Sequence, residues 1–280
     1  MKLLAPSRES FNFAAMKYAF LGAGKMSMAL IKGMLRANLC SASDITVSSR
    51  SKSSLENLTA STGVTSAASN AEAVARGDAI LLCVKPADAA QALKEAGDAL
   101  EGRLLISIVT GLKITTLRKT APNLRVIRAM PNTAAMVGRS ATAIAVDQST
   151  PQEDTKTAER VFSAIGKVFL VPEDQLDAVT GLSGSGPAFV YLAMEALSEG
   201  GVAAGLPRAL ALDLAIQTVA GAAEMAASTR EHPARLREMV TSPGGTTVAG
   251  LLVLEGAAVR SALINAVRAA AARSKELSGQ

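Results

Sequence analysis

Near the start of the chain, a short apolar run leads through a glycine turn into an amphipathic helix. Residues 17–21 form the run, and Gly22, Gly24, Lys25 and Met26 belong to the turn. This order of elements predicts a dinucleotide site, with the pyrophosphate at the helix N-terminus. Ser27 stands where the fingerprint has its third glycine, so a tight turn without a ligand remains an alternative. The expected apolar face of the helix comprises Met26, Ala29, Leu30, Gly33, Met34 and Ala37.

The next strand, residues 45–48, bears on which dinucleotide would bind. An NAD site normally carries an acid about twenty residues beyond the glycines, whereas this chain has Ser49, Arg50, Ser51 and Lys52. Cations and hydroxyls without an acid favour a 2′-phosphate, so we expect NADPH as the cofactor, with NADH as the second choice. An ordinary solvated and capped helix start after Arg50 would explain the same residues.

Strands and helices continue to alternate through the first half of the chain. Residues 79–84 are a nearly continuous apolar run, which is typical of a central parallel strand buried on both faces. Asn70 is expected to cap the N-terminus of a short helix at residues 71–76, which precedes this strand. The alternation predicts an α/β fold, a Rossmann-type doubly wound sheet with ligands at the carboxyl ends of its strands. Further strands are expected at residues 64–65, 104–109, 125–130 and 141–146, and a helix at 53–60.

From about residue 177, β-branched runs become rare, and Ala, Leu and Met recur at helical spacing. Small-residue helices this apolar predict a module that buries itself against a second subunit, although helices that cap their own sheet in a monomer are the alternative. We expect three parts: a loose extension (1–15), an NADP-binding Rossmann domain (16–177), and an all-α dimerisation and substrate-binding domain (178–280). The expected helices are 187–204, 207–227, 233–240, 246–255 and 259–277.

A loop that turns into a helix near residue 246 has the parts to hold a small carboxylate. Gly244 and Gly245 let the backbone approach a ligand, and the free N–H groups of the following helix attract an anion. Hydroxyls of Ser242, Thr246 and Thr247 add directed hydrogen bonds. A Pro-Gly turn with a Ser or Thr N-cap is the competing interpretation.

Composition narrows the classes of function. The net charge is +5 and aromatic residues make up only 3%, without a basic stripe, which disfavours nucleic acid as a partner. Cys40 and Cys83 lack metal-ligand spacing, so we expect reduced packing residues in a cytoplasmic protein and no metal site. The longest apolar strings, such as 79–84 and 248–254, are too short to cross a bilayer, and residues 1–15 lack a signal-peptide pattern.

Several segments together resemble the Δ1-pyrroline-5-carboxylate reductase family, whose members make L-proline. The loops at residues 180–188 and 241–247 are the most specific, while the first three segments also suit β-hydroxyacid dehydrogenases. Lys25 and Ser27 depart from the residues more frequent in the family, and residues 1–15 have no counterpart there. The resemblance rests on residues 21–29 (LGAGKMSMA), 84–86 (VKP), 128–133 (RAMPNT), 180–188 (TGLSGSGPA), 241–247 (TSPGGTT) and 265–277.

The resemblance implies roles for individual residues. The nicotinamide half of the cofactor would lie against Val84, Lys85 and Pro86 and against Met130, Pro131 and Asn132. The 2′-phosphate would be met near Ser49, Arg50 and Ser51, and the adenosine ribose near Asn70. Ser242 and the N–H groups of Thr246 and Thr247 would hold the substrate carboxylate, with the Thr247 hydroxyl facing the ring nitrogen. Family members form interlocked dimers, commonly assembled into decamers of five dimers.

Imine reduction needs little acid–base machinery, because a hydride from the nicotinamide and a proton on nitrogen complete it. His232, the only histidine, precedes a proline at a helix start, where we expect a cap, and Thr247 is the better partner for the reacting nitrogen. A hydroxyacid reductase is disfavoured, because no Gly-x-x-Gly-x-x-x-Lys pattern follows residues 180–188. A related imine reductase and a nucleotide-binding protein without turnover remain alternatives.

Overall fold

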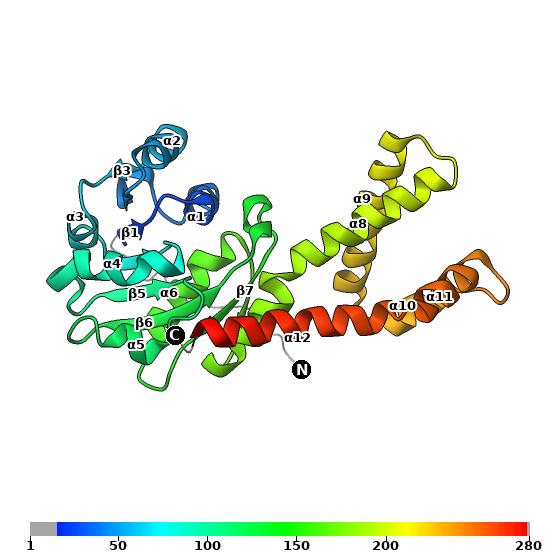
Figure 1. The fold of residues 1–280 in the computed structure, drawn as a ribbon. Helices are drawn as coiled ribbons and strands as arrows, with labels where there is room; N and C mark the ends of the chain where they lie inside the picture. Colours follow the sequence, from blue (N-terminus) through cyan, green and yellow to red (C-terminus); the bar gives the residue numbers. More distant parts are fainter. Residues whose placement is uncertain (1–15, 279–280) are drawn as a thin grey trace, which may run out of the picture. The chain divides into compact units, whose positions relative to one another are not determined.

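The computed structural model describes residues 16–278, and the expected extension at residues 1–15 lies outside them (Figure 1). The chain divides between Leu176 and Asp177 into two compact units, the second of which ends at Glu276. The domain boundary expected from the sequence lies one residue later, between 177 and 178.

The first unit is built on one eight-stranded sheet with the order β3-β2-β1-β4-β5-β6-β7-β8. All neighbouring strands are parallel except β6 and β7, which run antiparallel. The order reverses at β1, which pairs with β2 on one side and β4 on the other, so the ligand-binding crevice of such a sheet falls there. The strands are Tyr18–Leu21 (β1), Ile45–Ser48 (β2), Thr65–Ser66 (β3), Ala79–Leu82 (β4), Leu104–Ser107 (β5), Arg125–Met130 (β6), Ser140–Ala145 (β7) and Gly166–Leu170 (β8).

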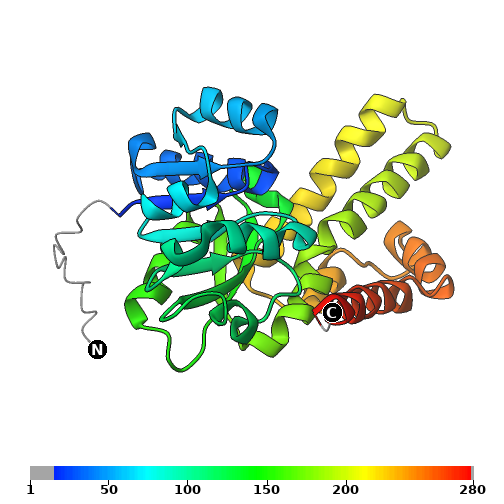
Figure 2. The ribbon, with the colours of Figure 1, turned by 60° about the vertical axis from the view of Figure 1, so that its left-hand side comes forward.

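Helices alternate with the strands, as can be followed from blue to green in Figure 2, and the predicted doubly wound fold is confirmed. Strand β8 is not among the strands expected from the sequence. Its residues are mostly exposed or half-buried, which removes the buried apolar signature of the central strands. The helical segments of this unit are α1 (Lys25–Arg36), η1 (Ala42–Asp44), α2 (Lys52–Thr62), α3 (Asn70–Ala75), α4 (Pro86–Ala96), η2 (Gly97–Leu100), α5 (Ile114–Arg118), η3 (Thr133–Val137), α6 (Gln152–Ser163) and η4 (Glu173–Gln175).

Two hydrophobic clusters cover the two faces of the sheet. Along β1, Phe20 joins the cluster that contains Leu30 of α1 and Phe162 of α6, while Leu21 joins the cluster that contains Leu93 of α4. Successive side chains of a strand point to opposite faces, so all four residues of β1 are buried. The first unit therefore has a complete core of its own.

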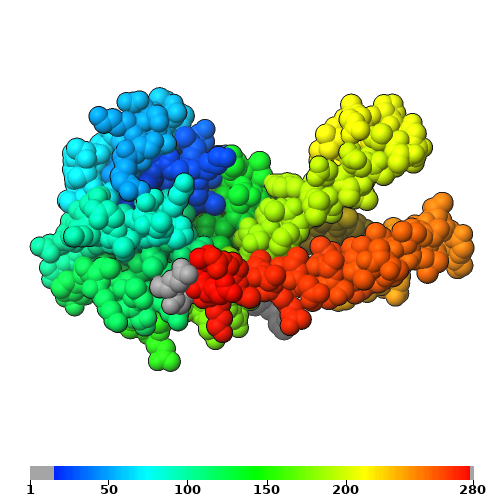
Figure 3. All heavy atoms as spheres, viewed as in Figure 1, coloured from blue at the N-terminus to red at the C-terminus, as the bar shows by residue number. Residues whose placement is uncertain are grey.

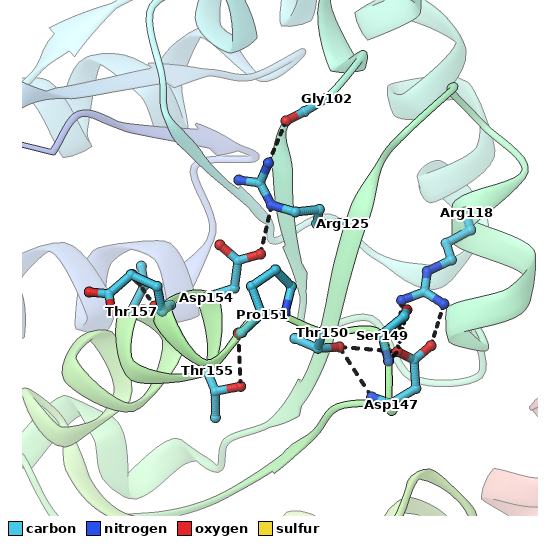
Figure 4. A network of polar contacts seen from close by, with 11 residues as sticks. Gly102, Arg118, Arg125, Asp147, Ser149, Thr150, Pro151, Asp154, Thr155 and Thr157 are labelled. Atoms are coloured by element: carbon cyan, nitrogen blue, oxygen red, sulfur yellow. Dashed lines mark hydrogen bonds and ion pairs between the residues drawn. The ribbon is translucent and has the colours of Figure 1, made fainter.

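Ion pairs connect strand β6 with helix α6, and the segment after β7 with helix α5 (Figure 4). Arg125 of β6 donates to Asp154 in the first turn of α6 at 2.6 Å and to the Gly102 carbonyl at 2.8 Å. Asp147, after β7, pairs with Arg118 of α5 and accepts a hydrogen bond from the Ser149 backbone at 2.9 Å. The hydrogen bond with Arg118 is the main reason that the pKa of Asp147 falls from 3.8 to about 2.

The second unit is almost entirely helical. Its helix α8 packs against α9, where a side chain on Gly201 would approach Ala211 Cβ at 3.1 Å. A side chain on Gly181 would likewise meet the backbone of Val267 at 2.6 Å, so small residues bring these segments close. The segments are α7 (Leu176–Val179), the π-helix η5 (Thr180–Gly184), α8 (Gly186–Ala203), α9 (Arg208–Thr229), α10 (Pro233–Met239), α11 (Thr246–Gly256) and α12 (Val259–Ser278).

Apolar side chains of the second unit are widely exposed. Among the described residues of this unit, Ala211 and Ala215 are its only buried apolar residues, whereas Leu252 is 69% exposed and Ile216 45% exposed. In Figure 3 the atoms of α12 lie at the surface along the helix, in orange and red. An exposed apolar area of this kind marks a surface that is covered by another molecule.

One described helix, α9, is long and apolar enough by length and composition to cross a bilayer, and the bent pair α11 and α12 meets the same test together. The sequence-based expectation that no segment could cross a bilayer considered only uninterrupted apolar strings. Helix α9 meets the criteria because its polar residues are few and scattered, so its mean hydropathy stays high. Core helices of soluble proteins pass this test as well, so it does not by itself place a helix in a membrane.

Candidate functional site

A cavity of about 270 Å³ opens at the carboxyl ends of β1, β2 and β4, where the strand order reverses. It brings together four segments that are distant in sequence: the glycine turn after β1, the serine and arginine segment after β2, Asn70 at the start of α3, and residues 83–95, which run from the end of β4 along α4. Eight of the predicted cofactor residues line it: Gly22, Gly24, Ser49, Arg50, Ser51, Asn70, Val84 and Lys85. Ala23, Ser54, Cys83, Asp88, Gln91, Ala92 and Glu95 complete the lining.

The glycine turn leaves room and hydrogen-bond donors for an anion. Gly22 has φ +108°, and a side chain there would meet the Cys83 carbonyl oxygen at 2.7 Å. A Cβ on Gly24 would meet nothing within 4 Å, so space is open beside the start of α1. Gly24 is the N-cap without a side-chain cap, and the first turn carries no acid. The N–H groups at this helix start are therefore suited to a pyrophosphate.

Ser27 has a role that its small size alone does not reveal. Its side chain is buried, and Oγ donates a hydrogen bond to the Gly22 carbonyl at 2.6 Å. This bond ties α1 to the turn before it. A glycine at the same position would allow close packing but could not form the bond, because it lacks the hydroxyl.

The segment after β2 forms the capped helix start that one interpretation of its sequence expected, and it also places Arg50 in the lining of the cavity. Ser51 caps α2, since its Oγ accepts a hydrogen bond from the Ser54 backbone at 3.3 Å. Arg50 projects a side chain that is 64% exposed and forms an ion pair with Asp88 of α4. The cation at the rim of the cavity is thus partly neutralised by an acid from another element.

Asn70 is not the helix cap that its sequence position suggested. Ser69 is the N-cap of α3, and its Oγ accepts from the Glu72 backbone at 3.1 Å. The Asn70 side chain instead joins neighbouring elements around the cavity, because it accepts from Ser48 Oγ at 2.6 Å and donates to Glu95 at 2.8 Å. These bonds hold Asn70 against the wall where the resemblance expects a ribose.

Four polar residues of the lining were missed from the sequence, namely Ser54 on α2 and three residues of α4. Asp88, Gln91 and Glu95 all lie on α4, at helical spacings of three and four. Glu95 accepts from Gln91 at 2.9 Å as well as from Asn70. The spacing was a signal that could have placed them on one face of the helix, but only the fold shows that this face meets the cavity.

The segment after β4 contributes Cys83 to the lining of the cavity. Burial raises the pKa of the Cys83 thiol to about 12, although a hydrogen bond with Ser27 acts in the opposite direction. Both Cys83 and Cys40 are free. Pro86 is the first residue of α4, where a missing N–H costs no hydrogen bond.

The remaining predicted cofactor residues lie outside the lining of this cavity. Lys25 faces a neighbouring cavity of about 450 Å³, which it shares with Gly24 and Ser54, and Met26 lines neither. Met130 ends β6, and the Asn132 side chain caps η3 by accepting from the Ala134 backbone at 3.2 Å. Pro131 lies between them. The predicted role of these residues toward the nicotinamide stays a prediction.

The second unit holds the predicted carboxylate site as a loop at the start of α11. Gly244 has φ +68°, which favours glycine, and the Gly245 N–H donates to the Ser242 carbonyl at 3.0 Å. Gly245 is the N-cap, with no side-chain cap and no acid in the first turn of α11. Ser242 and Thr246 are exposed and Thr247 is half-buried. No Ser or Thr side chain caps this helix, so its first N–H groups stay available to an anion.

His232 lies outside both arrangements. It is the N-cap of α10, where Nδ1 accepts a hydrogen bond from the Ala234 backbone at 3.2 Å. Across residues 16–278, no group of three or more His, Cys, Asp or Glu side chains could hold a metal ion. Neither observation supplies an alternative catalytic centre.

Comparison with known proteins assigns the two units. The model of the family "NADP oxidoreductase coenzyme F420-dependent" matches residues 17–111, and the model "Pyrroline-5-carboxylate reductase dimerisation" matches residues 173–277. A Rossmann-type unit with a glycine turn at its switch point, followed by a helical dimerisation unit, defines a dinucleotide-dependent oxidoreductase. The chain belongs to the pyrroline-5-carboxylate reductase family.

The relatives extend over almost the full chain. A pyrroline-5-carboxylate reductase of Glycine max is 44% identical, over 96% of this chain and 100% of that protein. The structure of the reductase from Coxiella burnetii has a TM-score of 0.87 at 36% identity and covers 94% of this chain and 99% of its own. That of the Plasmodium falciparum reductase, with NADP bound, has a TM-score of 0.86 at 32% identity and covers 94% and 98%.

Proposed function

We infer that this protein reduces the imine of Δ1-pyrroline-5-carboxylate to L-proline, with NADPH as the hydride donor. The likeness to pyrroline-5-carboxylate reductases over nearly the whole chain carries this conclusion. The cavity of the first unit fits the cofactor, because it combines an uncapped helix start, open space beside Gly24 and a cation at its rim. The enzyme is an oxidoreductase that acts on a carbon–nitrogen bond.

When bound in this cavity, the dinucleotide would supply the hydride that the imine carbon accepts. Gly22, Gly24 and the N–H groups at the start of α1 hold the pyrophosphate, with Lys25 and Met26 beside it. Ser49, Arg50 and Ser51 meet the 2′-phosphate, and Asn70 lies toward the ribose. Val84, Lys85 and Pro86, together with Met130, Pro131 and Asn132, line the nicotinamide half.

The loop at the start of α11 orients the substrate. Ser242 and the N–H groups of Thr246 and Thr247 bind the carboxylate, while Gly244 and Gly245 let the backbone approach it. The Thr247 hydroxyl donates a hydrogen bond to the ring nitrogen and fixes the face of the imine that receives the hydride. Positioning supplies most of the acceleration, because the reaction needs only one proton on nitrogen.

The second unit is expected to associate with a second copy of the chain. The family's dimerisation model covers the unit whose apolar side chains are exposed, which supports a homo-oligomer. We propose a homodimer, assembled further into a decamer of five dimers, as a soluble protein of the cytoplasm. The apolar surface of α9 then lies in subunit contacts instead of a membrane.

The direct test mixes the purified protein with NADPH and pyrroline-5-carboxylate and follows the loss of the reduced nicotinamide absorbance. We expect oxidation of NADPH and formation of proline. The control replaces the imine with a 2-oxo acid, which a hydroxyacid reductase would reduce. Dinucleotide binding without turnover of either substrate would instead favour a nucleotide-binding protein.

The proposed phosphate site has its own test. Arg50→Glu places a like charge against the 2′-phosphate, so the dissociation constant of NADPH should rise by about tenfold or more while that of NADH changes little. Lys119→Glu is the matched control, since it makes the same type of charge reversal at an exposed lysine that does not line the cavity. Equal weakening of both cofactors would remove Arg50 from the phosphate site.

A further inference from the structure

The ion pair between Arg50 and Asp88 lies in the cavity that we assign to the adenosine end of the cofactor. Residues 48–52 contain no acid, yet the fold supplies one from the first turn of α4. Both residues line the cavity, and the Asp88 side chain is only 30% exposed. The carboxylate thus pairs with the cation that a 2′-phosphate would need.

A ribose phosphate and the Asp88 carboxylate are alternative anions for one guanidinium. Lys85 also lines this cavity as a cation, and Glu95 lines it as an acid, but Glu95 receives hydrogen bonds from Asn70 and Gln91. Binding a 2′-phosphate at Arg50 must loosen the pair or bring the phosphate close to a like charge. An unphosphorylated ribose leaves the pair intact and carries neither cost.

We propose that Asp88, by pairing with Arg50, sets the discrimination between the two nicotinamide cofactors and moderates the preference for the phosphorylated one. The inference rests on the proposed function, because it assumes that this cavity takes a nicotinamide dinucleotide. Asp88 acts through Arg50 and is a specificity-determining residue. It has no part in the transfer of the hydride.

The test measures binding of NADP⁺ and NAD⁺ to the full chain by titration calorimetry, without substrate. In Asp88→Asn the dissociation constant for NADP⁺ should fall by about two- to fivefold, the range of an exposed ion pair, while that for NAD⁺ stays unchanged. Asp98→Asn is the matched control, because it removes the same charge outside the cavity lining and should change neither constant.

A double substitution tests whether Asp88 acts through Arg50. In an Arg50→Gln background, Asp88→Asn should lose most of its effect on NADP⁺, because the competed cation is gone. An effect as large as in the wild type would overturn the pairing, and so would an Asp88→Asn variant that binds NADP⁺ no better than the wild type.

The outcomes separate this inference from the proposed function. If the wild type binds NADP⁺ and Asp88→Asn changes nothing, only the inference fails. If the wild type binds neither dinucleotide, the proposed function fails and the inference with it. If binding shifts as expected but no imine is reduced, the role of Asp88 stands and the assigned reaction falls.

Discussion

The two units of this protein differ in where their apolar side chains lie. In the first, both faces of the sheet are covered by helices, and side chains such as Phe20, Leu30 and Phe162 are fully buried. In the second, helices α8 to α12 leave most of their large apolar side chains at the surface, and Ala211 and Ala215 are the only buried apolar residues among those described. The first unit therefore buries its apolar side chains within one subunit, whereas the second unit leaves most of its own exposed.

This difference indicates that the second unit is stabilised by association with another subunit. Burial stabilises by about 25 cal/mol for each Å² of apolar surface removed from water, and the second unit gains little of this within one subunit. A second copy can supply the missing cover, since symmetric association buries the same surface on both partners. Four predictions test this contrast.

The largest effect should follow a charge on the exposed surface of the second unit. Leu252→Asp on α11 and Ile216→Asp on α9 should each weaken subunit association by about a hundredfold or more, because a buried, unpaired charge is costly at an interface. Sedimentation at a range of concentrations measures the change, and activity should fall with it.

Val137→Asp is the control for this surface. Val137 is 71% exposed on η3 of the first unit, so the same type of change should leave association intact. Unaltered association in both Leu252→Asp and Ile216→Asp would contradict the assignment of these helices to subunit contacts.

The core of the first unit should be sensitive to a single added methyl group. A Cβ on Gly33 of α1 would meet Ile165 Cγ2 and would lie 2.8 Å from the Ala164 carbonyl oxygen. Gly33→Ala should therefore lower the free energy of unfolding by about 1–3 kcal/mol, as measured by denaturant titration. Gly200→Ala is the matched control on α8, where a Cβ would meet nothing within 4 Å of the same subunit. A Gly33→Ala protein as stable as the wild type would show that the first core is looser than described.

Substitutions in the loop at residues 242–247 should change turnover without changing the stability of the protein. Thr247→Ala removes the hydroxyl assigned to the ring nitrogen, so turnover should fall by about ten- to a hundredfold with no change in the melting temperature. Thr246→Ala is the matched control, because the proposed contribution of Thr246 comes from its backbone N–H, which the variant retains. Equal losses in both variants would contradict this division of roles.

The smallest effect concerns Asp147, which is linked to Arg118. The pKa of Asp147 is lowered to about 2 in the folded protein, so its contribution to stability is present above its ordinary pKa of 3.8 and is lost as the pH falls through 2. About a third of each side chain is exposed, so screening limits the loss in Asp147→Asn at neutral pH to about 1 kcal/mol or less.

Denaturation of both proteins between pH 2 and pH 7 measures this loss, and the difference between them should shrink below pH 4. Asp174→Asn, at an exposed position of η4, is the control and should not show this dependence. A difference that is constant over the whole range would exclude the ion pair as its source.

The sequence predicted those parts of the fold that have a periodic or local signal. Residues 79–84 predicted the buried strand β4, and the glycine turn predicted the start of α1, because both signals come from neighbouring residues. Strand β8 was missed because its side chains are mostly exposed. Ser69 and Asn70 are both good caps, and only the tertiary bonds of Asn70 to Ser48 and Glu95 decide between them.

Many individual residues of the candidate site were predicted from the sequence, but the interactions between residues of different elements were not. The glycines, Arg50 and Lys85 could be chosen from motifs, whereas Asp88 and Glu95 enter the cavity only through the packing of α4 beside the strands. Pairing across elements has no counterpart in a linear pattern. The predicted boundaries of the three parts and the roles of the loop at residues 242–247 remain predictions.

The thiol of Cys83 has a consequence for the behaviour of the protein under oxidative stress. Burial raises the pKa of this thiol, so it stays protonated at neutral pH, whereas peroxides and electrophiles attack the ionised form. This cysteine of the cavity lining should thus react with oxidants more slowly than a cysteine of ordinary acidity.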